Sequence, residues 1–267
     1  MGDASPKLIF LHIPKTAGQS VHTALVQAYG ESAVCPARVN EQLFGMTVAE
    51  LNRYQVFSGH LDWSLLDCVC GPRFTFTVLR EPRDRILSFY FFLRAEAERM
   101  SAEELAKPQR HGARAILGLA PDDYFCGGTP ELRRFLDGLY DNFYTYFFAG
   151  RFYLARGPLN GRVSRGELRH EDLLERALDN LGTLDAVFRV DQLGEVFTRI
   201  SALSGVTLSG EEGYRVNVNE TVAADERLTR LRELGATDRS FNRIAQLCRL
   251  DQGLWERAPF ARAAGST

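Results

Sequence analysis

Hydrophobic and polar positions along the chain form short apolar runs separated by longer segments with helical spacing. Four runs have the apolar, β-branched composition of buried strands, over residues 7–13, 54–58, 74–79 and 186–190. Helical spacing follows over residues 19–29, 47–53, 83–99, 171–181, 192–203 and 238–250. Strands that alternate with helices form parallel sheets covered by helices. The pattern therefore predicts an α/β fold with three layers, α/β/α, and a central parallel sheet, in one domain over residues 1–267.

The turn after the first strand has the residues of an anion-binding site. Pro14 ends the strand, because it has no N–H for a sheet hydrogen bond. Gly18 lets a bound group approach the backbone closely, and the helical spacing begins directly after it. A helix N-terminus carries N–H groups and a partial positive charge, to which Lys15 adds a full charge. The sequence predicts that this turn holds a phosphate group.

A second polar turn follows the strand over residues 74–79. Arg80 ends this strand, Pro82 suits the first turn of a helix, and Ser88 lies on that helix. A guanidinium group binds phosphate through a fork of N–H groups, and a hydroxyl donates one more hydrogen bond. The carboxyl ends of parallel strands meet at one edge of the sheet, where ligands bind. We therefore expect Arg80 and Ser88 to hold a phosphate at the same edge as the first turn.

Both turns resemble the nucleotide-binding motifs of sulfotransferases that use 3′-phosphoadenosine 5′-phosphosulfate (PAPS). The segment Pro14-Lys15-Thr16-Ala17 resembles the phosphosulfate loop of the branch that contains heparan sulfate 2-O-sulfotransferase and many bacterial relatives. The resemblance implies a P-loop-like fold and PAPS as co-substrate. We expect no metal, because Lys15 and the loop N–H groups can supply the positive potential. It implies that Arg80 and Ser88 contact the 3′-phosphate. The residues that it assigns to the phosphosulfate loop are Lys15, Thr16, Ala17, Gly18, Gln19 and Ser20.

His60 is the candidate catalytic base. It follows the apolar run 54–58 and lies between the two phosphate motifs, whereas His12 lies within the first predicted strand and His22 on the first helix. The pair Gly59-His60 resembles the position of the catalytic histidine in the 2-O-sulfotransferase branch. An imidazole near its ordinary pKa can accept a hydroxyl proton at neutral pH. The alternative is a histidine that only holds a turn through a backbone hydrogen bond.

Lys15 is also a candidate catalytic residue. The chain has only three lysines among its 32 basic residues. A compact ammonium can lie beside a single bridging oxygen, where a planar guanidinium fits poorly. We therefore interpret Lys15 as a residue that stabilises charge on the departing phosphate, against the alternative of a solvated loop residue.

Composition limits the other classes of function. A formal charge of −2 and a pI near 6.2 give no general attraction to nucleic acid or membranes. The sequence shows neither a signal peptide nor a run of membrane-spanning length, and animal Golgi members of the family carry such an anchor. The five cysteines are an odd number, and Cys68 and Cys70 are too close for a usual zinc pair. We expect a bacterial, cytoplasmic enzyme with buried free thiols at Cys68 and Cys70.

The acceptor is a hydroxyl-bearing molecule whose identity the sequence leaves open. A glycan is the first choice, because the resemblance is to a carbohydrate sulfotransferase branch. An acidic peptide that contains tyrosine is the second choice, because the segment 151–169 is strongly basic and could attract it. The segment contains one acid, Glu167, and five arginines, namely Arg151, Arg156, Arg162, Arg165 and Arg169. That segment could instead be a solvated loop. The later segment 215–221 loosely resembles a loop that closes over the nucleotide in relatives.

Two rival functions remain at this stage. A P-loop kinase or NTPase is the first, with residues 187–191 as its metal-binding strand. Against it, Lys15 precedes Gly18, and the Gly-Lys-Ser/Thr ending that supplies the magnesium ligand is missing. The second rival is a non-catalytic nucleotide-binding protein that lacks a working base.

Overall fold

The computed structural model describes residues 5–208 and 224–261 and divides the chain into two compact units. The first unit contains Met1–Arg80, Tyr146–Val218 and Arg257–Thr267, and the second contains Glu81–Thr145 and Asn219–Glu256. The segment 215–221, expected to resemble a nucleotide-closing loop, lies outside the described residues.

A four-stranded parallel sheet forms the centre of the first unit. Its strands are β1 (Lys7–Leu11), β2 (Val56–Gly59), β3 (Arg73–Leu79) and β4 (Ala186–Arg189), in the order β2-β1-β3-β4. All three pairings are parallel, with Leu8 opposite both Val56 and Phe74. The four predicted strands and the parallel sheet are confirmed, each strand within two residues of its predicted ends.

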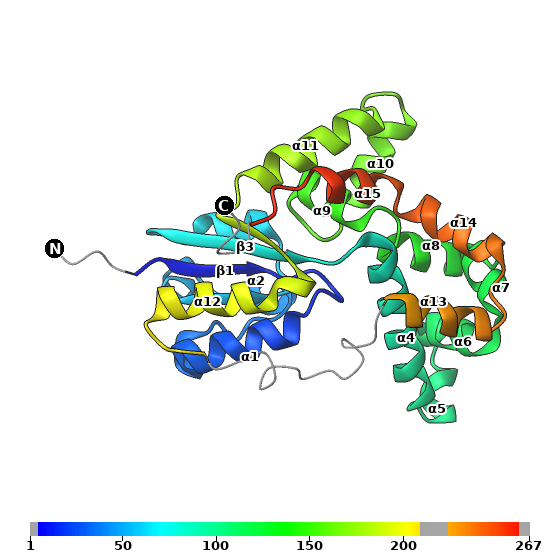
Figure 1. The fold of residues 1–267 in the computed structure, drawn as a ribbon, viewed down its shortest axis with the longest axis horizontal. Helices are drawn as coiled ribbons and strands as arrows, with labels where there is room; N and C mark the ends of the chain where they lie inside the picture. Colours follow the sequence, from blue (N-terminus) through cyan, green and yellow to red (C-terminus); the bar gives the residue numbers. More distant parts are fainter. Residues whose placement is uncertain (1–4, 209–223, 262–267) are drawn as a thin grey trace. The chain divides into compact units, whose positions relative to one another are not determined.

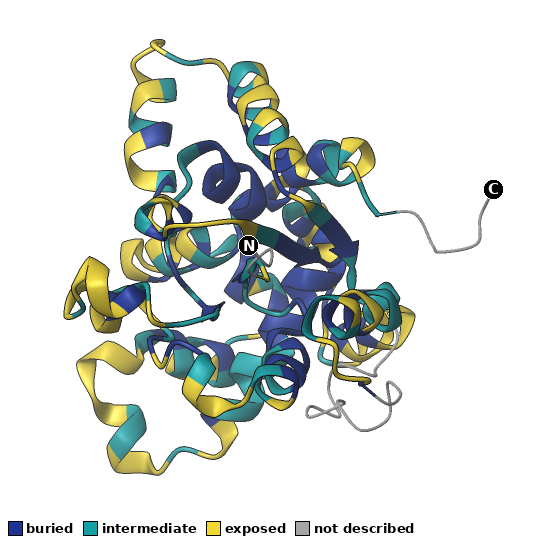
Figure 2. Cartoon of the chain, turned by 90° about the vertical axis from the view of Figure 1, so that its left-hand side faces the viewer, coloured by how far each residue is buried: buried dark blue, intermediate teal, exposed yellow. Residues whose placement is uncertain are grey.

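Helices cover both faces of this sheet (Figure 1). Helices α1 (Gly18–Tyr29) and α12 (Leu193–Ser204) pack on the face that carries Phe10, Phe76 and Val78. On the other side lie α9 (Phe143–Gly150), which enters the first unit at Tyr146, α10 (Arg156–Ser164) and α11 (His170–Gly182). Figure 2 shows the strands almost wholly buried, apart from the exposed beginning of β3. The predicted three-layer α/β/α arrangement is confirmed.

Short elements lie between the strands of the first unit and after the last of them. Those between strands are η1 (Glu31–Ala33), α2 (Asn40–Phe44), α3 (Val48–Leu51) and η2 (Trp63–Cys68), and η4 (Val190–Gln192) joins β4 to α12. Thr47 and Glu50 form a reciprocal capping box at the start of α3, but the helix is shorter than the predicted 47–53. Cys68 is half-buried and Cys70 exposed, because the turn between η2 and β3 runs along the surface. The prediction that both are buried thiols is wrong.

The second unit is helical. Its elements are α4 (Pro82–Glu98), α5 (Ala102–Ala106), η3 (Pro108–Arg110), α6 (His111–Gly118), α7 (Pro121–Cys126), α8 (Pro130–Leu139), α13 (Ala224–Glu233), α14 (Asp238–Leu247) and α15 (Arg249–Arg257). Proline occupies the first position of several of them, where its missing N–H has no cost. The predicted helix over 83–99 is confirmed as α4, and Glu81 caps it by accepting the Asp84 N–H at 2.7 Å.

One predicted helix, over residues 238–250, is divided in the structure. Helix α14 ends at Leu247, and α15 begins at Arg249. Asn142 causes the break, because its side-chain oxygen accepts the Leu250 N–H at 2.7 Å and its own N–H donates to the Leu247 carbonyl at 2.6 Å. These bonds take the place of the backbone hydrogen bonds that would continue the helix through residues 247–250. They come from a residue 108 positions away, so the local pattern could not predict them.

Candidate active site

The loop between β1 and α1 has a strained backbone. Lys15 and Ala17 have φ angles of 71° and 60°, in the left-handed region that favours glycine. This conformation costs about 1–2 kcal/mol for a residue with a Cβ. The Thr16 hydroxyl holds the turn by donating to the Ile13 carbonyl at 2.8 Å. Left-handed residues within such a turn direct successive N–H groups into an anion-binding concavity.

Helix α1 begins at Gly18, directly after this loop. Across the described chain, no side chain caps its N-terminus. The helix dipole therefore leaves a partial positive charge at this end, next to Lys15. Thr16, Ala17, Gly18 and Ser20 are buried and Gln19 is exposed. The six residues predicted for the phosphosulfate loop thus form one continuous turn and helix start.

Gly18 leaves room for the ring of His12. A Cβ built at position 18 would lie 1.7 Å from His12 Nε2. Gly18→Ala therefore cannot be accommodated without moving the ring or the loop. We expect a loss of about 1–3 kcal/mol in the free energy of unfolding, the usual cost of overpacking, measured by urea denaturation.

Gly157→Ala is the matched control for this substitution. Gly157 lies within α10, and a Cβ there meets no atom within 4 Å. Alanine should leave stability unchanged or raise it by up to about 1 kcal/mol, because glycine is the poorer helix former. Equal effects of the two substitutions would contradict the close contact between Gly18 and His12.

Arg80 connects the second predicted phosphate motif to the first. Its side chain is buried at the end of β3, and its Nε donates to the Lys15 carbonyl at 2.8 Å. The structure thus brings Arg80 to the phosphosulfate loop, as expected for strands that end at the same edge. Ser88 is buried on α4 of the second unit and is placed only within that unit.

His60 lies directly after β2, and its ring stacks on that of His12. The ring centroids are 4.4 Å apart and the ring planes differ by 25°. The prediction that His12 lies within the first strand is wrong, because β1 ends at Leu11 and the chain turns there toward Pro14. The backbone N–H of His60 donates to the Arg38 carbonyl at 2.8 Å. Gly59 allows this approach, since a Cβ there would lie 2.6 Å from the same oxygen.

The two nitrogens of the His60 ring have different surroundings. Nδ1 lies 3.0 Å from the Tyr153 hydroxyl and 3.4 Å from the His12 carbonyl oxygen. The Tyr153 hydroxyl also donates to that carbonyl. Among the residues that the structure describes, none hydrogen-bonds to Nε2. Nε2 is therefore the nitrogen that can take part in proton transfer.

A second histidine cluster lies beside the first. Arg38 Nη1 contacts His22 Nδ1, and both lie 3.3 Å from the Ser58 hydroxyl oxygen. A guanidinium can only donate, so His22 Nδ1 is an acceptor and this ring is neutral. Burial, and then the charge of Arg38, lower the pKa of His22 to about 4.

The two stacked histidines are also held neutral. Burial lowers the pKa of His12 well below 6.5, and His60, Arg38, His22 and Lys15 lower it further. Burial lowers the pKa of His60 as well; the bond with the His12 backbone opposes this shift, and Arg38 adds to it. Both imidazoles therefore have an unprotonated nitrogen at neutral pH, as a general base requires.

Four of the five arginines between residues 151 and 169 pair with acids, and Arg156 lies over an aromatic ring. Arg165 and Arg162 lie 2.5 and 3.7 Å from Glu167. Three more pairs or stacks complete the segment, namely Arg169 with Asp172, Arg151 with Asp67, and Arg156 over the Tyr146 ring. Asp172 and Asp67 lie outside the segment 151–169, so a count of acids within that segment could not include them.

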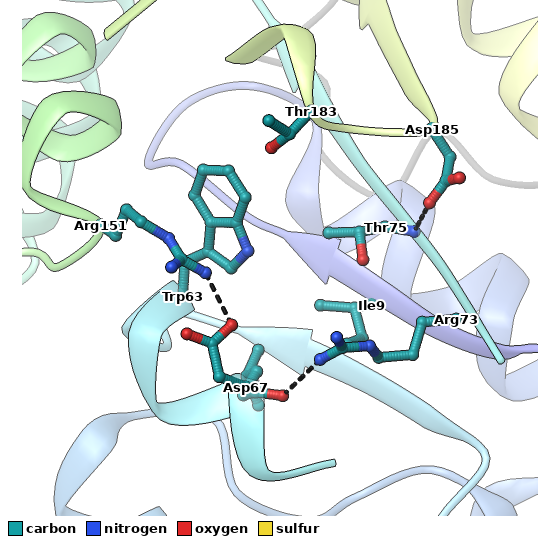
Figure 3. Close-up of a pocket in the computed structure, with 9 residues that line it drawn as sticks. Ile9, Trp63, Asp67, Arg73, Thr75, Arg151, Thr183 and Asp185 are labelled. Carbon is teal, nitrogen blue, oxygen red and sulfur yellow. Dashed lines mark hydrogen bonds and ion pairs between the residues drawn. The ribbon is translucent and has the colours of Figure 1, made fainter. Parts of the chain in front are cut away.

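A cavity of about 310 Å³ lies at the opposite end of the strands (Figure 3). Arg73, the first residue of β3, and Asp185, just before β4, line it together with Trp63 and Arg151. Asp185 accepts the Thr75 N–H at 2.7 Å, and Arg73 donates to the Leu66 carbonyl at 3.1 Å. These polar groups are engaged in holding the loops together, so we assign the cavity no chemistry.

The sequence did not reveal that Tyr153 contacts His60, or that the His12 ring stacks on the His60 ring. Tyr153 reaches His60 from 93 positions away, and nothing in its local pattern indicates this. His12 had a signal that could have been used. It is a polar residue between the apolar Leu11 and Ile13, directly before the anion-binding turn.

A comparison with known families agrees with this geometry. Residues 2–252 match the sulfotransferase family, and the chain belongs to that family. A separate comparison of the sequence with curated proteins finds no match. Within residues 5–208 and 224–261, no helix combines the length and the apolar character that crossing a membrane requires.

Proposed function

We propose that this protein transfers a sulfuryl group from PAPS to an acceptor hydroxyl. The observation that carries the proposal is the contact between Arg80 Nε and the Lys15 carbonyl, 2.8 Å apart, at the carboxyl edge of the sheet, because it joins one residue of each predicted phosphate motif. A donor with a 5′-phosphosulfate and a 3′-phosphate has two anionic groups that match these motifs.

His60 starts the proposed reaction by accepting the acceptor's hydroxyl proton at Nε2. A bond then forms between the acceptor oxygen and sulfur, while the bond between sulfur and the 5′-phosphate oxygen breaks. The products are a sulfate ester and adenosine 3′,5′-bisphosphate, and the proton leaves His60 for solvent. Lys15 and the loop N–H groups stabilise the negative charge that develops on the departing phosphate. By analogy with phosphoryl transfer, positioning and charge stabilisation supply most of the catalysis.

The remaining predicted residues hold the donor. The residues proposed to bind the 5′-phosphosulfate are Lys15, Thr16, Ala17, Gly18, Gln19 and Ser20. Arg80 and Ser88 are proposed to bind the 3′-phosphate, which distinguishes PAPS from nucleotides that lack this group. Burial of Arg80 supports its role, because a charge-assisted hydrogen bond is stronger where water is excluded.

A glycan is the proposed acceptor class. The rival, an acidic tyrosine peptide, was favoured by the arginines between residues 151 and 169. Their pairing with Glu167, Asp172 and Asp67 reduces the net charge that they offer to such a peptide. We propose a bacterial cytoplasmic setting, which the five free thiols support.

Donor binding tests the proposal. Arg80→Ala should weaken adenosine 3′,5′-bisphosphate by about 1.5–3 kcal/mol, the scale of a hydrogen bond to a charged group. The same substitution should barely affect adenosine 5′-phosphate. Isothermal titration calorimetry measures both affinities.

Arg53→Ala is the control for the loss of an arginine, because Arg53 is an exposed residue of the same unit. It should leave both affinities unchanged. Equal losses for the two nucleotides in Arg80→Ala would reject the assignment of Arg80 to the 3′-phosphate.

A further inference from the structure

We propose that Tyr153 is a positioning residue that fixes the tautomer of His60, with the proton on Nδ1 and the lone pair on Nε2. The inference rests on the proposed function, in which Nε2 accepts the hydroxyl proton. Tyr153 itself does not touch the reacting atoms in this scheme. It acts through the His60 ring.

Hydrogen-bond chemistry sets the direction of each bond around Nδ1. The His12 carbonyl oxygen can only accept, so the Tyr153 hydroxyl gives it its one proton. The hydroxyl oxygen then offers only lone pairs to His60 Nδ1, 3.0 Å away. The same carbonyl oxygen lies 3.4 Å from Nδ1 and again can only accept. Both neighbours of Nδ1 therefore require a proton on that nitrogen, which leaves Nε2 unprotonated in the neutral ring.

Aromatic contacts fix the orientation of the ring. His12 stacks on one face of His60, with ring centroids 4.4 Å apart. The Tyr153 ring meets His60 edge-on at 5.6 Å, with an angle of 77° between the planes. The Phe147 ring in turn packs edge-on against Tyr153, with ring centroids 5.0 Å apart. These contacts fix the plane of the ring, and the hydrogen bonds at Nδ1 fix which edge of the ring faces Tyr153.

The loop that carries Tyr153 is anchored to the segment after His60. The Tyr153 N–H donates to Asp62 Oδ1 at 2.7 Å, and the Ser64 N–H donates to the Arg151 carbonyl at 3.0 Å. Arg151 pairs with Asp67 at 2.6 Å and lies over the Trp63 ring at 4.4 Å. Figure 3 shows Arg151, Trp63 and Asp67 in this clamp. The cavity wall described above therefore holds the Tyr153 loop against His60.

The orienting partner is a neutral hydroxyl and not a carboxylate. Within residues 5–208 and 224–261, His12, Tyr153 and Arg38 are the titratable or charged groups that act on His60. A carboxylate at Nδ1 would stabilise the protonated imidazole, whereas a tyrosine hydroxyl orients the ring and leaves it neutral. Tyr153 thus selects the tautomer of the base while the ring stays unprotonated.

Nitrogen-15 NMR of the histidine rings in Tyr153→Phe tests the inference without reference to catalysis. His60→Asn assigns the His60 signals by their disappearance. In the wild-type protein at neutral pH we expect Nδ1 to carry the proton and Nε2 to be unprotonated. In Tyr153→Phe the His12 carbonyl alone remains, and the signals should shift toward a mixture of the two tautomers.

Turnover supplies the second readout. Tyr153→Phe should lower kcat by about 10–100-fold, the usual cost of losing a residue that orients another functional group. KM for the donor should stay within about twofold, because in the proposed scheme Tyr153 acts on His60 and not on the donor. Tyr146→Phe is the matched control. It removes a hydroxyl bonded to Asn160 at 3.2 Å, in the same unit, and should change neither readout.

A wild-type His60 with its proton on Nε2, or a Tyr153→Phe protein with an unchanged tautomer, would overturn the inference. The proposed function would survive that result if the wild-type protein still transfers sulfate. Conversely, a tautomer shift in a protein that transfers no sulfate would support the role of Tyr153 and reject the proposed function.

Discussion

His60→Ala should lower the rate of sulfuryl transfer by about 10²–10⁴-fold, the usual contribution of a positioned general base. The protein should still fold and bind adenosine 3′,5′-bisphosphate, because the His60 side chain is half-buried and the phosphosulfate loop is held by Thr16 and Arg80. His60→Asn should be nearly as inactive, since an amide can hydrogen-bond but cannot accept a proton at neutral pH. Turnover with labelled donor and calorimetry measure the two properties separately.

The pH dependence of the wild-type rate follows from the surroundings of His60. Burial lowers the pKa of this imidazole below 6.5. A base must be unprotonated, so the rate should decline at acidic pH as Nε2 becomes protonated. The decline should set in at a lower pH than it would for a histidine with the ordinary pKa of 6.5. His60→Asn should lack this decline.

His170→Asn is the control, because His170 begins α11 and takes no part in the proposed site. It should leave the rate and its pH profile unchanged. Wild-type turnover in His60→Asn would mean that the histidine is structural and that another group acts as base.

Lys15→Ala should lower turnover by about 10²–10³-fold, as expected for the loss of one preorganised charge that stabilises the transition state. The effect on donor affinity should be smaller, because the loop N–H groups and Arg80 remain. Lys15→Arg should recover little, because a guanidinium fits poorly beside a single bridging oxygen. Single-turnover kinetics separate the chemical step from donor binding.

Lys7→Ala provides a matched control for the loss of a lysine. The Lys7 ammonium bonds to the Asn52 carbonyl at 2.7 Å, at the start of β1 and away from the loop. This substitution should leave turnover unchanged. A near-normal rate in Lys15→Ala would show that the loop N–H groups suffice and that Lys15 is peripheral.

The sheet and the phosphosulfate turn could be predicted because their determinants are local. Four apolar runs specify the strands, and Pro14 and Gly18 specify the end of β1 and the start of α1. Parallel strands end at one edge, so the approach of Arg80 to Lys15 follows from topology. Pattern and topology together therefore predicted the turn after β1 and the position of Arg80 beside it.

Other features depend on side chains from distant parts of the chain. Asn142 ends α14 by bonding to Leu247 and Leu250, and neither partner could be inferred from the apolar spacing around it. Tyr153 reaches His60 only because Asp62 and Arg151 fix the path of its loop. The aromatic residues of α9 are buried, as their apolar rings require. Hydrophobic periodicity predicts burial well, but it carries no information on which polar groups meet.

Transfer of radioactive sulfate from ³⁵S-labelled PAPS is the measurement that tests the central claim most directly. The purified protein is incubated with labelled PAPS and with fractionated glycans or acidic tyrosine peptides, in the presence of EDTA. We predict that label moves to a glycan fraction, with release of an equal amount of adenosine 3′,5′-bisphosphate. Absence of transfer to every acceptor, together with magnesium-dependent hydrolysis of ATP, would contradict the account and favour a P-loop kinase or NTPase.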